Sequence, residues 1–145
     1  MSPMATPVEL PGEEKVRLLT ADPNLTADEA NRNADLFIRA GKLAQAMMFL
    51  ERSRDRERLG RTKDEAVRQG DAFLLHWISR IAPDLVTETE WRDAGGRAMA
   101  EGKLLFAREC FEKAGDPEKA QKAREDWLKI FPSPAVPPPP PAPTA

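Results

Sequence analysis

Apolar residues recur every three or four positions along most of the chain, which is the period of one face of an α-helix. Sustained alternation of apolar and polar residues, which would indicate strands, is absent from the sequence. The pattern therefore predicts an all-α fold of about six to seven helices. We expect a short helix near 13–19 and further helices near 27–40, 42–57, 63–81, 88–101, 103–114 and 117–130. The helix at 63–81 is apolar over much of its circumference and is expected to be central.

Capping signals mark where several of these helices begin. Thr26, Thr62 and Thr87 each stand three residues before a Glu, the capping-box pattern in which both side chains bond to free backbone amides of the first turn. Asp116 followed by Pro117 is another start, because Asp is a good N-cap and Pro loses no hydrogen bond at the first helical position.

Glycines and one proline mark where the helices end. Gly41, Gly102 and Gly115 stand just after the last helical turn, where a residue in the left-handed αL conformation commonly ends a helix. Pro83 is expected to end the helix that begins after Thr62, because proline cannot continue a helix from within.

Two segments repeat one spacing of small residues, turn glycine and large apolar residue. Their successive gaps are 4, 7, 5, 4 and 3 in both the first series, Ala30, Ala34, Gly41, Ala46, Leu50 and Ser53, and the second, Trp91, Gly95, Gly102, Ala107, Phe111 and Ala114. The pattern Trp91-x₂-Ala94-Gly95-x₂-Ala98, then Ala107-x₃-Phe111, then Pro117, resembles the signature of the tetratricopeptide-repeat family. The resemblance implies antiparallel helical hairpins stacked in a short α-solenoid array.

The second segment departs from the family in three respects. Ala94 and Ala98 replace the usual leucine and aromatic residue, and Pro117 arrives about two residues early. Gly41 and Gly102 are 61 residues apart (102 − 41), which is short of two family repeats, so we expect residues 62–82 to form one long helix between the two hairpins. An irregular helical bundle, or a related solenoid such as the helix pairs of vesicle-coat subunits, is the alternative.

The resemblance also implies a function, because tetratricopeptide-like domains are non-enzymatic adaptors or scaffolds that bind a peptide or helix of a partner protein. The family's groove positions fall on Asn31, Asp35, Ile38, Arg39, Arg92, Gly96, Met99 and Ala100. The clamp that holds acidic C-terminal tails in this family needs Lys and Asn at Asn31, Asp35, Arg92 and Gly96. Only Arg92 keeps the charge there, so we expect no binding of such tails. Gly96 either leaves room for a ligand backbone or loosens its helix, and we prefer the second interpretation.

Composition excludes several other classes. The chain has 22 basic and 24 acidic residues and a formal net charge of −2, so no strong field attracts nucleic acid or an anionic membrane. One cysteine excludes an internal disulfide and a Cys-based zinc site. Neither a signal peptide nor an apolar run long enough for a membrane helix is evident. We expect a cytoplasmic protein whose partner is another protein or a larger assembly, not nucleic acid or a membrane. The oligomeric state is left open.

Candidate chemistry is sparse. His76 is the single histidine, and no acidic residue lies one turn away from it on its own helix. It is interpreted as a packed or half-exposed residue beside Trp77, and Cys110 as a small buried side chain instead of a reactive thiol. We therefore expect no enzyme activity, no cofactor and no metal site. The alternative is a small helical ligand-binding domain or enzyme subunit centred on His76 and Trp77.

The sequence also predicts the character of the two terminal segments and of one charged run. Residues 1–12 are expected to be flexible, 13–131 to form the helical domain, and 132–145, with eight of the 14 prolines, to be a disordered tail. The tail contains PxxP spacings that fit SH3-like grooves, but no basic residue flanks them, so a spacer is the preferred interpretation. The run at 51–63 holds six basic and three acidic residues without an aromatic, which favours a solvated helix end over a nucleic-acid site.

Overall fold

The described chain is all-helical, which confirms the predicted fold class. The computed structural model describes residues 9–132, and most of the expected flexible N-terminal segment and nearly all of the proline-rich tail lie outside the described residues. Within 9–132 the elements are α1 (Glu13–Ala21), α2 (Ala27–Arg39), α3 (Leu43–Ser53), α4 (Arg56–Gln69), α5 (Ala72–Ile81), the 3₁₀ turn η1 (Pro83–Leu85), α6 (Glu88–Ala100), α7 (Leu104–Lys113) and α8 (Pro117–Ile130).

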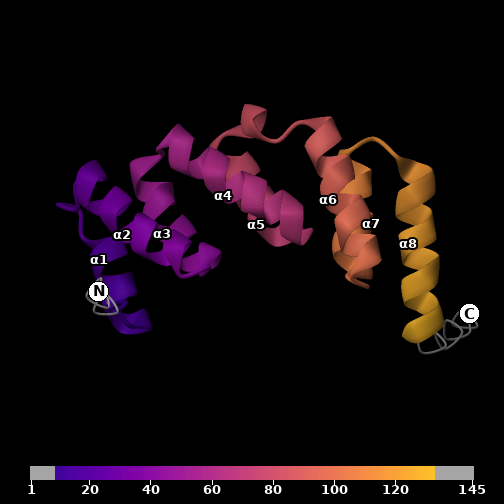
Figure 1. Ribbon diagram of the computed structural model, residues 1–145, viewed down its shortest axis with the longest axis horizontal. Coiled ribbons are helices and arrows are strands. Elements are labelled where there is room, and N and C mark those ends of the chain that lie inside the picture. Colours follow the sequence, from indigo (N-terminus) through magenta and orange to yellow (C-terminus); the bar gives the residue numbers. More distant parts are fainter. Residues whose placement is uncertain (1–8, 133–145) are drawn as a thin grey trace, which may run out of the picture.

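The helices stand side by side in an arched row, with α1 at one end of the arch and α8 at the other (Figure 1). Successive helices pair as α2 with α3, α4 with α5, and α6 with α7, and α8 packs on α7. Across the pairs, α4 packs on α6, while α5 packs on both α3 and α7. The helices α2, α4 and α6 therefore form one layer and α3, α5 and α7 the other. The first helix, α1, lies against α3.

The prediction of one long helix at 63–81 is wrong, because a turn at Gly70 divides this segment into α4 and α5. Gly70 takes a left-handed φ of 63° and ends α4, and the carboxylate of Asp71 then caps α5 by accepting from the Leu74 N–H at 3.1 Å. The helix predicted at 42–57 also ends early, at Ser53, because Arg54 is left-handed with φ 55°. A third hairpin, α4 with α5, thus occupies the space between the two predicted ones.

The capping box predicted at Thr62 is also wrong. Thr62 is fully buried inside α4, and its hydroxyl donates to the carbonyl of Arg58 at 2.9 Å. Asp55 caps this helix instead, by accepting from the Arg58 N–H at 2.9 Å. The boxes at Thr26 and Thr87 are confirmed, since both reciprocal hydrogen bonds are present at each.

The predicted glycine stops are confirmed, and Gly70 adds a fourth turn of the same kind. Gly41, Gly102 and Gly115 have φ of 73°, 75° and 71°. In each of the four turns, the N–H after the glycine bonds to the carbonyl five residues earlier, at 2.8 to 2.9 Å. This is the Schellman arrangement, which satisfies the last free carbonyls of the helix. Each turn thus joins its two antiparallel helices through only two or three connecting residues.

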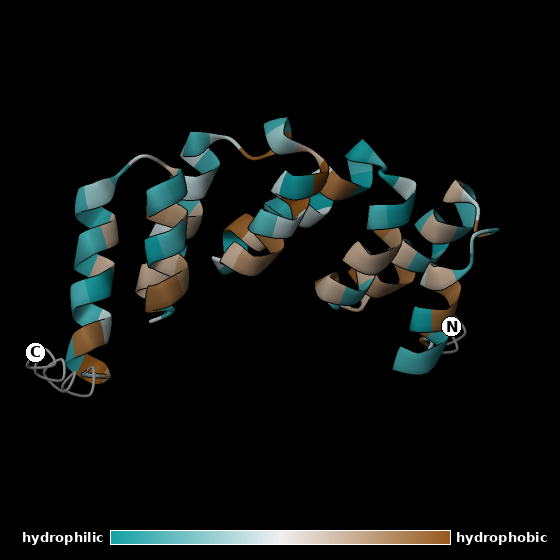
Figure 2. Cartoon of the chain, turned by 180° about the vertical axis from the view of Figure 1, so that it is seen from behind, coloured by the Kyte–Doolittle hydropathy of each residue, from teal (hydrophilic) through white to brown (hydrophobic). Residues whose placement is uncertain are grey.

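The buried side chains form one large cluster from α1 to α7 and a smaller one between α6, α7 and α8. The large cluster contains a stacked aromatic pair, Phe37 and Phe49, with ring centroids 5.9 Å apart. Alanines dominate the small cluster, which lets the backbones of α6, α7 and α8 approach closely. Most of α8 is hydrophilic apart from its C-terminal end, as Figure 2 shows. Such a polar last helix closes a stack of helical pairs against water.

Candidate functional site

A hollow of about 370 Å³ lies between α2 and α4, on the layer formed by α2, α4 and α6. We call it the valley, and its lining residues are Ile38, Arg39, Gly41, Leu43, Arg61, Asp64, Glu65, Arg68 and Gln69. Ile38 is half-buried and Leu43 is buried, whereas Arg39, Arg61 and Asp64 are exposed. The valley therefore combines an apolar floor with a rim of both charges.

An ion pair connects α2 and α4, which form the two walls of the valley. The guanidinium of Arg58, on α4, donates to both carboxylate oxygens of Asp35, on α2, at 2.8 and 3.0 Å. These hydrogen bonds lower the pKa of Asp35; partial burial acts against them, and the positive charges of Arg58, Arg61 and Arg39 add to the lowering. A bidentate pair of this kind holds its partners in a fixed geometry as well as attracting them.

Two of the groove residues expected on α2 are used inside the fold. Asp35 is engaged by Arg58, and the Asn31 amide nitrogen lies 3.5 Å from a carboxylate oxygen of Asp55. The Asn31 side-chain oxygen is buried and accepts no hydrogen bond from the described residues. Ile38 and Arg39 are the α2 residues that line the valley. The four residues therefore lie together, but they divide into two that hold α4 and two that face the hollow.

Arg92 and Met99, expected on α6, lie apart from the valley. A guanidinium nitrogen of Arg92 donates to the carbonyl of Ala114 at 3.3 Å, at the end of α7. Met99 packs against the small cluster that α6 shares with α7 and α8. Both side chains belong to the side of α6 that faces the end of the array, and α4 stands between them and α2.

Sequence reasoning missed the wall that α4 supplies. Arg61, Asp64 and Arg68 line the valley. Asp64 and Arg68 were expected at the start of one long helix between the hairpins, and Arg61 in a charged run at a solvated helix end. A signal was available, because Gly70 followed by Asp71 repeats the turn that Gly115 and Asp116 make.

His76 and Trp77, paired in the alternative interpretation, point to different sides of α5. The His76 ring lies 5.0 Å from the Trp91 ring, and its Nε2 is 3.5 Å from a carboxylate oxygen of Glu109 on α7. It borders a hollow of about 480 Å³ together with Trp91, Lys113 and others. Trp77 instead lies against Phe73 on the side toward α3, with ring centroids 5.8 Å apart. The structure thus separates the pair but supplies His76 with an acidic neighbour that its own helix lacks.

Cys110 is fully buried in the large cluster. Burial raises the pKa of its thiol to about 12, and the negative charges of Glu109 and Asp71 act in the same direction. A thiol in this environment stays protonated near neutral pH, and the thiolate is the reactive form. The side chain therefore has the character expected of a packing residue.

The charged run at 51–63 does more than solvate a helix end. The guanidinium of Arg52 donates to the carbonyls of Thr20 and Asp22 at 2.6 and 2.8 Å, so it fastens the end of α1 to α3. Arg56 forms a bidentate pair with Asp84 of η1, at 3.1 and 2.8 Å. The arginines of this run therefore join elements that are far apart in the sequence.

Comparisons with known proteins give no relative. No protein-family model, no curated protein and no solved structure matches this chain. Along residues 9–132, no group of three or more His, Cys, Asp or Glu side chains lies in a position to hold a metal ion. None of the helices in that range combines the length and apolar character that crossing a membrane requires.

Proposed function

We propose that the chain is a non-enzymatic adaptor or scaffold of a tetratricopeptide-like kind, which binds a peptide segment or helix of a partner protein in the valley between α2 and α4. The observation that carries the proposal is the composition of this hollow. Ile38 and Leu43 give it an apolar floor, and the exposed side chains of Arg39, Arg61 and Asp64 border it. An amphipathic segment with charges flanking one or two apolar anchors complements such a surface.

The partner's apolar anchor is best matched by the space beside Ile38. Burying one leucine- or isoleucine-sized side chain there would contribute about 1.5–3 kcal/mol. The charged rim then orients the segment and excludes partners of the wrong charge pattern. The polar atoms of Asn31 and Asp35 face Asp55 and Arg58, which supports the expectation that acidic C-terminal tails are not held at these positions.

Site-specific photocrosslinking in the source cells tests the proposal. A photoreactive residue is placed at Arg39 or at Arg61, on opposite walls of the valley, and at Arg124 on α8 as the control. All three positions are exposed. We expect both valley positions to capture the same protein and the α8 position not to capture it.

A charge reversal then shows whether the captured protein depends on the rim. The variant Arg39→Glu/Arg61→Glu is compared with Arg124→Glu after circular dichroism shows that both remain helical. Loss of capture in the valley variant alone supports the proposal. A partner captured equally from α8, or one that the valley variant retains at full yield, contradicts it.

The surroundings of His76 favour one second candidate, a ligand-binding or catalytic site between α5, α6 and α7. His76, Arg80, Trp91 and Lys113 border one hollow, and Glu109 lies within 3.5 Å of the imidazole. Such a set could bind a small anion over an aromatic face. Chemical shifts of the His76 ring, followed while a small-anion library is added, test this candidate. Saturable shifts in the full chain that Lys113→Ala abolishes favour it, and their absence removes it.

A further inference from the structure

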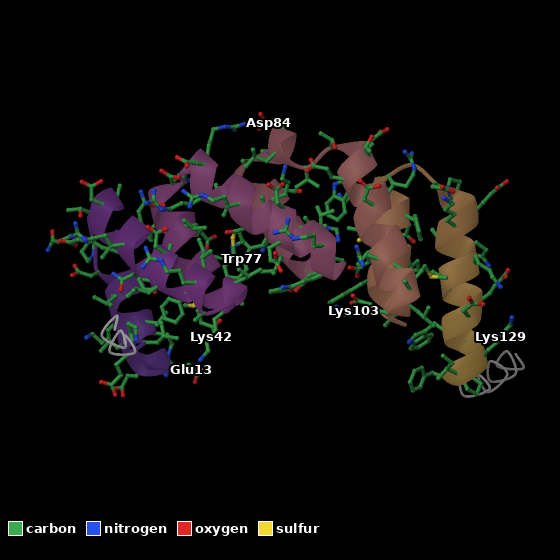
Figure 3. The ribbon with its side chains drawn as sticks, viewed as in Figure 1. Glu13, Lys42, Trp77, Asp84, Lys103 and Lys129 are labelled. Carbon is green, nitrogen blue, oxygen red and sulfur yellow. The ribbon has the colours of Figure 1, made fainter. Side chains whose placement is uncertain are left out.

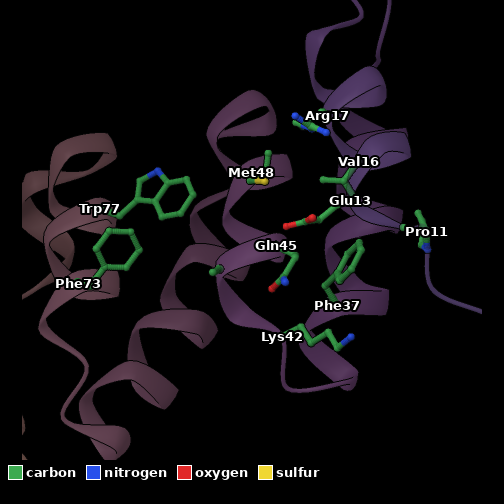
Figure 4. Close-up of a pocket in the computed structure, with 12 residues that line it drawn as sticks. Pro11, Glu13, Val16, Arg17, Phe37, Lys42, Gln45, Met48, Phe73 and Trp77 are labelled. Carbon is green, nitrogen blue, oxygen red and sulfur yellow. The ribbon is translucent and has the colours of Figure 1, made fainter.

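A second hollow, of about 500 Å³, lies on the opposite layer from the valley, between α1, α3 and α5. We call it the aromatic groove. Its lining residues are Pro11, Gly12, Glu13, Val16, Arg17, Phe37, Lys42, Ala44, Gln45, Met48, Phe73 and Trp77. Figure 4 shows Phe73 and Trp77 on one wall, with Glu13, Gln45 and Met48 across from them. In the whole molecule, Trp77 lies under the middle of the arch, above Lys42 and Glu13 (Figure 3).

Two aromatic rings dominate this groove. Phe73 and Trp77 stand one turn apart on α5 and contact each other edge to face, with centroids 5.8 Å apart. Phe73 is 55% exposed, although it is a large apolar side chain. The buried side chains of Val16 and Phe37 continue the apolar surface beneath them. A contiguous apolar surface that stays open to water is typical of a binding site.

The rim of the groove supplies hydrogen-bond donors. Arg17, Lys42 and Gln45 border it, and their side chains carry guanidinium, ammonium and amide N–H groups. A polyproline II segment has no internal hydrogen bonds, so its carbonyls are free to accept from such donors. Aromatic walls with donors at the rim are the features by which proline-rich segments are recognised.

We propose that the chain's own proline-rich tail, residues 134–143, docks in the aromatic groove of the same molecule, with proline rings packed on Phe73 and Trp77. Seven of the ten residues in this segment are proline, and none is charged. Docking it therefore removes no charged group of the tail from water, and a proline-rich chain loses little conformational entropy when it binds.

The tail follows the end of α8, which lies at the same edge of the molecule as the first turn of α5. Ile130 and Phe131, at the end of α8, share a hollow with Gly102 and Lys103 of the α6/α7 turn. The ammonium group of Lys103 in turn donates to the carbonyl of Gln69 at 2.8 Å, at the α4/α5 turn. The end of α8 and the two turns thus lie along one edge, and Phe73 belongs to the first turn of α5 at this edge.

The length of the tail suffices for the distance. Because α7 packs against both α5 and α8, these two helices are about 20 Å apart, at 8–10 Å for each step. Residues 133–145 extend about 40 Å as polyproline II, at 3.1 Å per residue. About half of the tail therefore remains available to contact the groove after it has crossed α7.

Proline-labelled NMR of the full chain tests the docking. Proline ring protons packed on an indole or phenyl face are shifted upfield, and we expect such shifts in the wild type. They should be lost in Trp77→Ala and in a variant whose seven prolines within residues 134–143 are replaced by glycine and serine. Phe73→Ala should reduce them, and it keeps the test valid if Trp77→Ala fails to fold. Trp127→Phe, next to the root of the tail, should leave them unchanged.

Three outcomes overturn the proposal. Upfield shifts that disappear in Trp127→Phe and persist in Trp77→Ala would place the tail on the end of α8. Shifts that remain entirely unchanged after the proline replacement would come from prolines outside the tail, such as Pro11, which borders the groove. Wild-type spectra without any such shift would leave the groove unfilled by this chain.

A mixing experiment separates docking within one molecule from docking between two. Labelled Trp77→Ala chain, which has the tail but not the complete groove, is mixed with unlabelled chain that carries the proline replacement. No upfield shift is expected from the mixture. Recovery of the shift would mean that the tail occupies the groove of a second copy, which contradicts the proposal.

Discussion

Gly70 lies so close to Ala98 that a Cβ atom on the glycine would stand 2.7 Å from the Ala98 backbone nitrogen. It would also stand 3.0 Å from the carbonyl oxygen of Ala94. The end of α4 thus rests directly on the backbone of α6, and the ammonium group of Lys103 fastens the same place by donating to Gln69. The second and third hairpins are joined at this point by contact between backbones, which no larger residue allows.

Gly70→Ala should therefore destabilise the protein more than the same change at another turn. A left-handed alanine costs about 1–2 kcal/mol, and the contact with Ala98 adds the cost of separating α4 from α6. Gly41→Ala is the matched control, since Gly41 has a similar φ of 73° and nothing within 4 Å of its added Cβ. Urea unfolding should give a distinctly lower midpoint for Gly70→Ala than for Gly41→Ala. Equal midpoints for the two variants would mean that the close approach of Gly70 to Ala98 does not affect stability.

Two adjacent glycines of α6 should respond to alanine with opposite signs. A Cβ on Gly96 meets nothing within 4 Å, so Gly96→Ala should stabilise the protein by about 1 kcal/mol through helix propensity. A Cβ on Gly95 would stand 2.8 Å from the ring of Phe111, which is itself buried. Gly95→Ala should be destabilising, because overpacking costs about 1–3 kcal/mol. Thermal unfolding checks both, and a stabilised Gly95→Ala would contradict the packing described.

The ion pair between Asp35 and Arg58 should make stability depend on acid pH. The hydrogen bonds from Arg58 hold the pKa of Asp35 below its ordinary value of 3.8 in the folded protein. Its contribution is therefore present above about pH 4 and is lost as the pH falls through the folded pKa. Asp35→Asn should cost roughly 1 kcal/mol at pH 7, and the difference from wild type should shrink below pH 4.

Asp84→Asn is the control for the acid-pH prediction. Asp84 also pairs with an arginine, Arg56, but both side chains are well exposed to solvent. Its removal should change the free energy of unfolding less than Asp35→Asn does. Urea titrations at pH 3 and pH 7 check the comparison. A constant difference between Asp35→Asn and wild type across this range would be inconsistent with the pair.

Cys110 should react with thiol reagents only when the fold opens. Its pKa of about 12 leaves almost no thiolate near neutral pH, and the side chain is buried. Labelling with a disulfide reagent at pH 8 should be slow in the native protein and rapid in concentrated urea. Stability should also fall as pH rises from 9 toward 12, because the thiol ionises more readily in the unfolded chain. Cys110→Ala should lose that alkaline dependence, and fast native labelling would contradict the burial.

Much of the fold could be predicted from local signals that the sequence states explicitly. The capping boxes at Thr26 and Thr87 and the glycine turns at Gly41 and Gly102 are all present as expected. These signals are reliable because each depends only on hydrogen bonds between residues that are a few positions apart in the sequence. The number and type of most elements follow from them.

The error at α4 and α5 has a physical cause. Thr62 stands three residues before Glu65, but in the middle of a helix its hydroxyl bonds to the preceding turn, so the same letters need not mean a cap. Asp55 and Asp71 are the true caps, and they lack the reciprocal Glu that made the other starts conspicuous. Apolar residues continue on both sides of Gly70, which concealed the turn.

The candidate site was less predictable than the fold. The four predicted groove residues on α2 lie together, but the contacts of two of them depend on the next hairpin, because Asp35 accepts from Arg58 and Asn31 donates to Asp55. Contacts of this kind depend on how whole helices pack, and no short-range pattern in the sequence predicts them. Glu109 beside His76 is a second example, since 33 residues (109 − 76) separate them.

The two joints between the hairpins are built from different contacts. At Gly70 the backbone of α4 lies against that of α6, and the ion pair between Lys63 and Glu90 spans the same joint. Between α2 and α4, the ion pair of Asp35 with Arg58 lies beside the valley. A segment that enters the valley therefore lies against the joint between the first two hairpins, where a change in the spacing of α2 and α4 alters the curvature of the arch.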